Sequence, residues 1–271
     1  MILAGMVVLL TRIHAQEYVW KSVPIDGSLT GCTASAADNV DKTIGVIGQD
    51  GSYYSPSGKK FSPSSSTAKV AAIVLNAQPE MVDLKRVVAY SAAKMQRLRY
   101  ESPLSNWFVG LIMDKVSALS GKKCHVGICN FGGIRQGMPK GKVLLDDIQS
   151  MFPFKNYLVH LQMKGIELRK VFESMAQNGF QAVAGVQIEV VDKKLVSVMS
   201  DGQPLDDEKV YDVATISFLL DGGDGLRLAD SSLSVNQYDV LISDAVLEHV
   251  NTLTAEGKLI TSPNVQYVVI R

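Results

Sequence analysis

The sequence predicts an α+β or mixed α/β fold, and two patterns lead to this prediction. Segments with the apolar spacing of a helix alternate irregularly with short apolar runs that are typical of strands. Some strands are joined by tight turns, as at Asp192-Lys193-Lys194, which indicates hairpins. Apolar residues make up 46% of the 271 residues, which is enough for a sizeable core.

The first third of the chain predicts little regular structure. Residues 17–66 are rich in glycine, serine, threonine and proline, and we interpret them as an irregular, partly β arm. The alanine- and valine-rich segment 67–78 predicts a helix, which Pro79 ends because proline cannot continue it. The short apolar run at 87–90 predicts a strand.

A long helix is predicted to begin at Pro103, where Leu104, Trp107 and the apolar residues after them follow helical spacing. Ser102 is suited to cap this helix and Gly121 to end it. The same patterns predict further elements down to the C-terminus. These are strands at 124–130, 157–163, 183–191, 195–199, 210–216 and 265–270, and helices at 143–151, 166–175 and 243–253.

The first fifteen residues have the composition of a signal peptide. Met1–Leu10 is nearly all apolar, and Ile13 and Ala15 fit the −3 and −1 positions of a cleavage before Gln16. This run of ten residues is too short to span a bilayer, so we predict no transmembrane segment here. We therefore expect residues 1–15 to be removed and the protein to be periplasmic or secreted; the alternative is a buried N-terminal strand.

The charge balance excludes one class of partner. The 27 basic residues equal the 27 acidic residues in number. A chain without net charge has no electrostatic reason to bind nucleic acid or an anionic membrane. Any phosphate group must therefore be held by a few well-placed side chains, and we expect no nucleic-acid partner.

Three short segments combine glycines, aromatic rings and polar groups. They are Asn130–Arg135, Phe152–Phe154 and Phe218–Gly225, and a weaker fourth is Glu101–Asn106. Paired glycines let a backbone approach a ligand closely, because no Cβ intervenes. An arginine presents a planar fork to a phosphate, and aromatic rings stack on a nucleobase at about 1–3 kcal/mol each. An aspartate in a glycine turn accepts hydrogen bonds from hydroxyl groups such as those of ribose.

These segments, in this order and at this spacing, resemble the C-terminal nucleotide-recognition domain of the 5′-nucleotidase / UDP-sugar hydrolase family. The resemblance covers about residues 90–270. It implies a layered α/β sandwich, with a mixed sheet inside and helices outside, at residues 91–271. Residues 16–90 are then expected to form an irregular arm packed on this main domain.

The resemblance also implies roles for individual residues. Phe154 and Phe218 are expected to clamp the base, and Asp224 to accept hydrogen bonds from the ribose. Asn130 and Arg135 are expected to make polar contacts, Arg135 towards the phosphate. The full set of expected ligand-binding residues is Asn130, Gly132, Gly133, Arg135, Phe154, Phe218 and Asp224.

Each of these residues also has an ordinary interpretation when it is taken alone. Phe154 and Phe218 would be core aromatics, the glycine cluster at 222–225 a tight turn, and Arg135 a solvated surface residue. Only the ordered set favours descent from the nucleotide-binding domain. The family has a further arginine upstream of the Glu101 segment, and here Arg97 and Arg99 lie close without falling on that position.

The residues for hydrolysis are expected elsewhere. In the family, a separate N-terminal domain binds two divalent metal ions, and such a site needs several histidine and aspartate ligands. This chain has four histidines, at 14, 125, 160 and 249, and lacks the Asp-x-His and Gly-Asn-His-Asp/Glu segments that would supply those ligands. We therefore expect no cofactor in this chain, no catalytic residues and no hydrolysis by the chain alone.

Three functions remain open from the sequence. The first is a subunit that binds a nucleotide and presents its phosphate to a separately encoded metallophosphatase, in nucleotide catabolism. The second is a stand-alone nucleoside- or nucleotide-binding protein without a catalytic partner. The third is a complete hydrolase that recruits metal through residues of no recognisable pattern.

Overall fold

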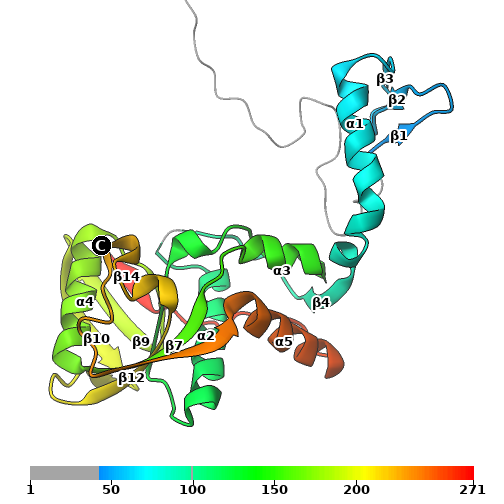
Figure 1. Ribbon diagram of the computed structural model, residues 1–271. Helices are drawn as coiled ribbons and strands as arrows, with labels where there is room; N and C mark the ends of the chain where they lie inside the picture. Colours follow the sequence, from blue (N-terminus) through cyan, green and yellow to red (C-terminus); the bar gives the residue numbers. More distant parts are fainter. Residues whose placement is uncertain (1–42, 99) are drawn as a thin grey trace, which may run out of the picture.

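The computed structural model describes residues 43–98 and 100–271, which form an α+β domain with a small unit projecting from it (Figure 1). The candidate signal peptide at 1–15 and the first part of the predicted arm lie outside the described residues. The layered α+β fold predicted from the sequence is confirmed.

A five-stranded mixed sheet forms the centre of the domain. Its strand order is β13 (Ser234–Leu241), β7 (Tyr157–Lys164), β12 (Val210–Ile216), β5 (Val126–Cys129) and β8 (Ala182–Ala184). Strand β12 runs parallel to β5 and antiparallel to β7. Strand β7 also pairs antiparallel with β13, and β5 pairs antiparallel with β8. This arrangement brings the start of some strands and the end of others to one edge of the sheet.

Two smaller sheets complete the β structure of the main domain. One has the order β11 (Gln203–Pro204), β10 (Lys194–Ser200), β9 (Val186–Val191) and β14 (Val268–Ile270). The predicted hairpin at Asp192-Lys193-Lys194 joins β9 to β10, with Asp192 and Lys193 in the left-handed conformation of a tight turn. The other sheet pairs β4 (Val87–Ser91) with β6 (Gly141–Leu144).

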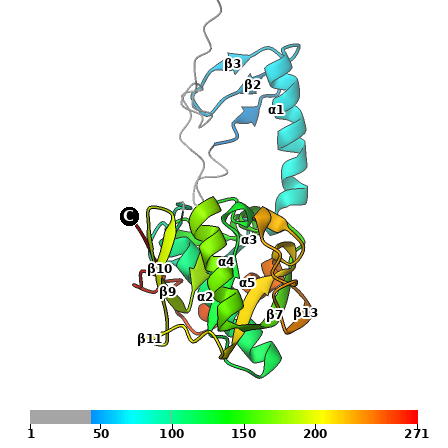
Figure 2. The ribbon, with the colours of Figure 1, turned by 90° about the vertical axis from the view of Figure 1, so that its left-hand side faces the viewer.

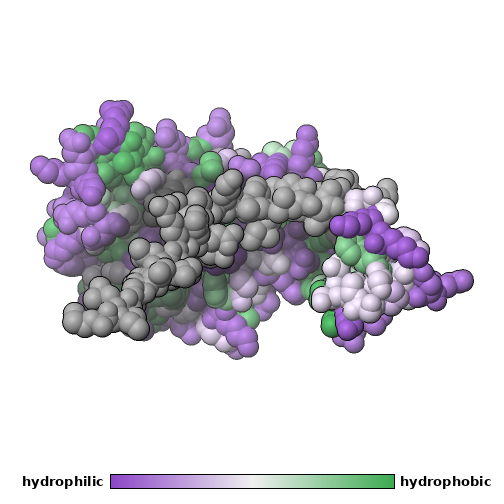
Figure 3. Space-filling model, turned by 90° about the horizontal axis from the view of Figure 1, so that it is seen from above, coloured by the Kyte–Doolittle hydropathy of each residue, from purple (hydrophilic) through white to green (hydrophobic). Residues whose placement is uncertain are grey.

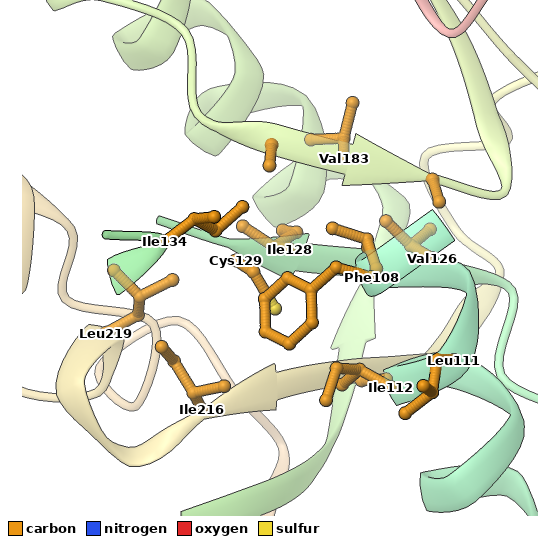
Figure 4. Close-up of a cluster of buried hydrophobic side chains, with 14 of the residues drawn as sticks. Phe108, Leu111, Ile112, Val126, Ile128, Cys129, Ile134, Val183, Ile216 and Leu219 are labelled. Carbon is orange, nitrogen blue, oxygen red and sulfur yellow. The ribbon is translucent and has the colours of Figure 1, made fainter. Parts of the chain in front are cut away.

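Four helices pack on these sheets: α2 (Pro103–Ser120), α3 (Leu145–Met151), α4 (Gly165–Asn178) and α5 (Ile242–Ala255). Helix α2 packs on the central sheet so closely that a Cβ added at Gly127 of β5 would lie 2.5 Å from Cγ1 of Val109. Helix α4 packs against β7 and β10, which belong to different sheets (Figure 2). Figure 4 shows side chains of α2, β5 and β12 meeting in one apolar cluster, among them Phe108, Ile112, Ile128 and Ile216.

The projecting unit consists of β1 (Val46–Ile47), β2 (Tyr53–Tyr54), β3 (Lys60–Phe61) and α1 (Ser66–Ala77). Helix α1 points away from the domain, to which it is joined through the 3₁₀ turns η3 (Gln78–Met81) and η4 (Asp83–Lys85) (Figures 1 and 2). The structure thus differs from the expectation of an arm packed on the domain along its described length. Packing begins only at η4, which contacts α3, and at β4, which pairs with β6.

The N-terminus of α2 is fastened to the end of the chain by Glu101. Its carboxylate accepts hydrogen bonds from the backbone N–H groups of Tyr267 and Val268, at 2.7 and 2.9 Å, and from the Asn106 amide at 2.9 Å. The predicted cap also forms, because the hydroxyls of Ser102 and Ser105 each accept a hydrogen bond from the other residue's backbone N–H. The helix ends at Gly121, whose φ of 68° is left-handed.

We predict that Glu101→Ala lowers the free energy of unfolding by about 2 kcal/mol or more, because it removes an ionised acceptor from two backbone donors. Urea unfolding followed by circular dichroism would measure this loss. Glu208→Ala is the control, since Glu208 forms only an exposed ion pair with Lys164 and is expected to cost less than about 0.5 kcal/mol. Equal effects of the two substitutions would contradict the assignment of Glu101 as a clamp.

Candidate functional site

The predicted ligand-binding residues meet at one edge of the central sheet. Strands β5 and β12 are parallel, so Asn130, which follows β5, and Phe218, which follows β12, emerge at the same edge. Strand β7 is antiparallel to β12, and Leu158 pairs with Ile216. Phe154, just before β7, therefore lies at this edge as well. Side chains that are up to 88 positions apart in the sequence are brought together by strand register alone.

Two hydrogen bonds fix the strand ends beneath the site. The Thr215 hydroxyl of β12 donates to the backbone oxygen of Ile128 in β5 at 2.8 Å, and both residues are fully buried. On the other side of β12, the backbone N–H of Tyr157 donates to the Ser217 hydroxyl at 3.0 Å. The loops that carry Asn130, Phe154 and Phe218 therefore start from fixed positions.

Phe154 and Phe218 are not ordinary core aromatics. Their exposed fractions are 48% and 43%, whereas the neighbouring Phe152 is buried and stacks on Phe108 with 4.4 Å between ring centroids. Phe218 is held from behind, because a Cβ added at Gly223 would lie 2.0 Å from its backbone oxygen and 2.7 Å from its ring. Glycine at 223 is therefore required for the position of Phe218. Two large rings remain half exposed beside a well-filled core.

The glycine pair lies over the side chain of Asn130. A Cβ added at Gly133 would lie 2.7 Å from Oδ1 of Asn130, so only glycine allows this close approach. Asn130 is only 6% exposed, and its Oδ1 has no hydrogen-bond partner among the described residues. Asn130 lines a narrow hollow together with Gly133, Phe154 and Asn156. A buried acceptor without a partner costs about 1–3 kcal/mol.

Asp224 lies in a separate, wider hollow on the same loop system. It is in the 3₁₀ turn η7 (Gly223–Gly225) with a left-handed φ of 48°, between Gly222 at 109° and Gly225 at 79°. Its Oδ2 would be 3.8 Å from a Cβ added at Gly132, and both residues line a hollow of about 390 Å³. Within the described chain no donor reaches its carboxylate, so both oxygens remain available to hydroxyl groups.

Two arginines border the glycine loop. The guanidinium of Arg135 lies over the ring of Phe154, 5.7 Å from its centroid, and donates to the backbone oxygen of Gly132 at 3.2 Å. This cation–π contact holds Arg135 at the ring face. Arg97 donates to the backbone oxygen of Ile134 at 3.0 Å and lines the Asp224 hollow. Arg99 lies outside the described residues.

Two amide side chains at this edge were absent from the sequence-based set. Asn156, just before β7, lines the hollow of Asn130 and Phe154. Gln181, just before β8, accepts a hydrogen bond from the backbone N–H of Phe131 at 3.0 Å and lines the Asp224 hollow. Both precede strands that are antiparallel to their neighbours, so the topology brings them to this edge.

A comparison with known proteins identifies a family. The family described as "5'-nucleotidase, C-terminal domain" matches residues 87–231 of this chain. The apyrase of Tabanus yao is 30% identical over 162 residues, which are 49% of this chain and 29% of the apyrase. The UshA protein of Yersinia enterocolitica is 32% identical over 105 residues, 37% of this chain and 19% of UshA. The chain spans less than a third of the length of these two relatives.

Solved structures share the fold. The 5′-nucleotidase precursor of Thermus thermophilus superimposes with a TM-score of 0.65 and 22% identity, over 80% of this chain and 48% of that protein. The NAD nucleotidase of Haemophilus influenzae gives a TM-score of 0.58 and 16% identity, over 81% of this chain and 48% of that protein. In both cases about half of the other protein has no counterpart here.

The two histidines of the central sheet region, His160 and His125, lie away from this edge. His160 of β7 is buried, and its Nε2 is 2.9 Å from Oδ1 of Asp212 in β12. His125, before β5, accepts a hydrogen bond from the backbone N–H of Asp212 at 3.1 Å through Nδ1. Over residues 43–98 and 100–271 no three His, Cys, Asp or Glu side chains are grouped so that they could hold a metal ion. Nor is any helix in this part of the chain long and apolar enough to cross a membrane.

The environment of His125 predicts a pH dependence of stability. Burial lowers the pKa of His125 below 6.5 and Lys209 lowers it further, although Asp212 and Asp201 act in the opposite direction. Between the folded pKa and 6.5 the unfolded chain binds more protons, so the free energy of unfolding should fall as the pH drops through this interval.

We expect His125→Gln to lose less stability than the wild type between pH 7.5 and pH 5.5, as measured by urea unfolding at both values. Burial also lowers the pKa of His249, so part of the pH dependence should persist in His125→Gln. It should shrink further when His249→Gln is added to His125→Gln. An unchanged pH dependence in His125→Gln would refute the assignment.

Proposed function

The chain belongs to the 5′-nucleotidase C-terminal domain family, and on this premise we propose that it binds a nucleotide and presents the phosphate to a separately encoded two-metal phosphatase. The observation that carries this proposal is the pair of half-exposed rings, Phe154 and Phe218, at one sheet edge beside a glycine loop. Nucleotide catabolism is the process that such a binding domain serves.

The base is assigned to the rings of Phe154 and Phe218. Both rings expose apolar surface that a stacked base would remove from water, at about 1–3 kcal/mol for each stack. Asn130 lines the hollow beside Phe154, and its side-chain amide is assigned to a polar contact with the edge of the base. Asn156 adds an amide in the same hollow.

The ribose and the phosphate are assigned to the other polar groups. Asp224 offers two free carboxylate oxygens, to which the vicinal hydroxyls of a ribose would donate. The guanidinium of Arg135 covers the face of Phe154. A base that stacks on Phe154 would displace the guanidinium, which can then form a bidentate pair with the phosphate.

Hydrolysis is assigned to another protein chain. The cleavage of a phosphate monoester requires one of the largest known rate enhancements, and one arginine with a base clamp does not provide it. The two divalent metal ions that would hold the attacking and leaving oxygens are therefore assigned to the partner. The apolar segment at 1–15 supports a periplasmic or secreted location for the complex.

A stand-alone nucleoside- or nucleotide-binding protein is the second candidate. It is favoured by the fact that every contact assigned above comes from this chain, so binding does not require a partner. The two candidates differ in whether phosphate is released when a metallophosphatase is present.

We predict that AMP and adenosine bind to residues 16–271 and that Phe154→Ala and Phe218→Ala each raise the Kd about 5- to 150-fold, from the loss of one stack. Isothermal titration calorimetry would measure these changes. Tyr90→Ala is the matched control, because Tyr90 is as exposed as Phe218 but belongs to β4. A wild-type chain that is folded but binds neither ligand would contradict the proposal.

Gly223→Ala should weaken binding without removing any ligand contact, because the added Cβ displaces Phe218. Gly110→Ala in α2 is the control, since a Cβ there meets no atom within 4 Å and alanine favours a helix. The two variants would be compared by the same titration. If Gly223→Ala binds like Gly110→Ala, the position of Phe218 does not matter for the ligand.

Phosphate release from AMP with Mn²⁺ or Zn²⁺ should stay at background for the chain alone. A colorimetric phosphate assay on the calorimetry samples would test this. Release that depends on added metal, and that disappears in Phe154→Ala, would show a complete hydrolase and would replace the proposed division of labour.

A further inference from the structure

We propose that the projecting unit, defined as α1 and β1–β3, is the surface on which the phosphatase chain docks. This inference rests on the proposed function, because it identifies where the partner of that function binds. It concerns residues 43–77, which lie before the segment matched by the family.

The unit exposes an apolar stripe along α1. Val70, Ile73 and Val74 have exposed fractions of 58%, 70% and 44%, and their i, i+3, i+4 spacing places them on one face. Val70 and Val74 also line a groove of about 590 Å³ together with Ile44 and Tyr53. Seen from above, apolar residues appear between hydrophilic ones on this unit (Figure 3).

The unit has almost no core of its own. Among residues 43–77 only Ser52 and Ala68 are buried, although the segment contains a twelve-residue helix and three strands of two residues each. Helices of this length are marginal in water unless an apolar face is packed. The stripe on α1 is therefore the surface that a binding partner would stabilise.

The structural comparison indicates what covers this surface. Residues 87–271 make up about two thirds of the chain, so the 80% matched by the Thermus thermophilus protein includes part of the chain before residue 87. The matched family domain is a C-terminal one, so the unmatched half of that protein lies on its N-terminal side. The projecting unit thus occupies the junction at which the second half would join.

The projecting unit is also connected to the part of the chain that carries Phe154. Its connection η4 contacts α3, and α3 ends at Met151, three residues before Phe154. Helix α3 has seven residues and is therefore only about 10 Å long. A chain bound to α1 is thereby connected, through η3 and η4, to the helix that leads into the Phe154 loop.

The chemistry of the unit specifies the partner surface. Three lysines, Lys59, Lys60 and Lys69, stand against a single acidic residue, Asp50, within residues 43–77. Asp50 is already paired with Lys60 at 2.8 Å, which leaves the unit with an excess of positive charge. The partner is therefore expected to present an apolar ridge bordered by carboxylates.

The test is photo-cross-linking from the exposed stripe. The purified chain, with p-benzoylphenylalanine in place of Ile73, is irradiated in an extract of the organism that encodes it, and the product is identified by mass spectrometry. The matched control carries the same group in place of Val196, which is 57% exposed in β10 on the other side of the molecule (Figure 2). We expect a chain with the aspartate and histidine ligands of a two-metal phosphatase, from position 73 only.

Four results would overturn the inference. They are a cross-link to a second copy of this chain, a cross-link to its own residues 1–42, equal labelling from positions 73 and 196, and no product at all. If the phosphatase is captured, its affinity is then measured with Ile73→Asp, which is expected to weaken binding more than about tenfold, and with Val196→Asp, which is not.

Nucleotide titration separates this inference from the proposed function. Ile73→Asp should bind AMP like the wild type, because residue 73 lies outside the base clamp. If AMP binds and no phosphatase cross-links, the docking surface is refuted and nucleotide recognition stands. If the phosphatase cross-links and AMP does not bind, the recognition role fails while the docking surface stands.

Discussion

The pairing of β12 with β5 on one side and β7 on the other is the constraint on which the site depends. A parallel and an antiparallel neighbour bring two strand ends and one strand start to the same edge. Three loops therefore begin within one small area, although their sequences are far apart. The buried Thr215–Ile128 bond and the Tyr157–Ser217 bond hold this alignment at its last residues. A register shift of one residue in β12 would turn Ile216 outward and move Phe218 with it.

The site combines a filled core with two half-exposed aromatic rings and one buried acceptor that has no hydrogen-bond partner among the described residues. Phe108 and Phe152 stack within the core, whereas Phe154, two residues later, is half exposed. The same contrast holds for polar atoms, since Thr215 is buried with a partner and Asn130 is buried with an acceptor that lacks one. Such groups reduce stability unless something covers or satisfies them, and the proposed nucleotide would cover the two rings.

The sequence predicts those parts of this arrangement that are encoded locally. The cap at Ser102, the end of α2 at Gly121 and the hairpin at 192–194 depend on a few neighbouring residues, and each forms as predicted. The pairs Gly132-Gly133 and Gly222-Gly223 are likewise visible as motifs, and the structure brings them to one edge. Their binding roles stay predictions until a ligand is measured.

Other features depend on contacts between distant segments, so local patterns missed them. Strand β13 is an edge strand without a buried residue, and the consecutive polar residues Asn236 and Gln237 interrupt the alternation by which strands are recognised. Gln181 reaches the site only because its strand runs antiparallel to its neighbour. The direction of α1 could not be predicted either, because alanine and valine at helical spacing do not specify which surface the helix will meet.

The hydrogen bonds of Glu101 affect the order in which the domain can fold during synthesis. Strand β14 is the last strand, and its partner β9 is parallel to it, so the pairing cannot form as a simple hairpin. The carboxylate beside α2 holds the backbone of residues 267 and 268 from a position more than 160 residues earlier. During synthesis the start of α2 emerges from the ribosome long before these residues exist, and Glu101 stays in water until its donors arrive. Closure of the domain is thus a late event in synthesis, because the first helix of the domain gains this attachment only after residues 267 and 268 have been made.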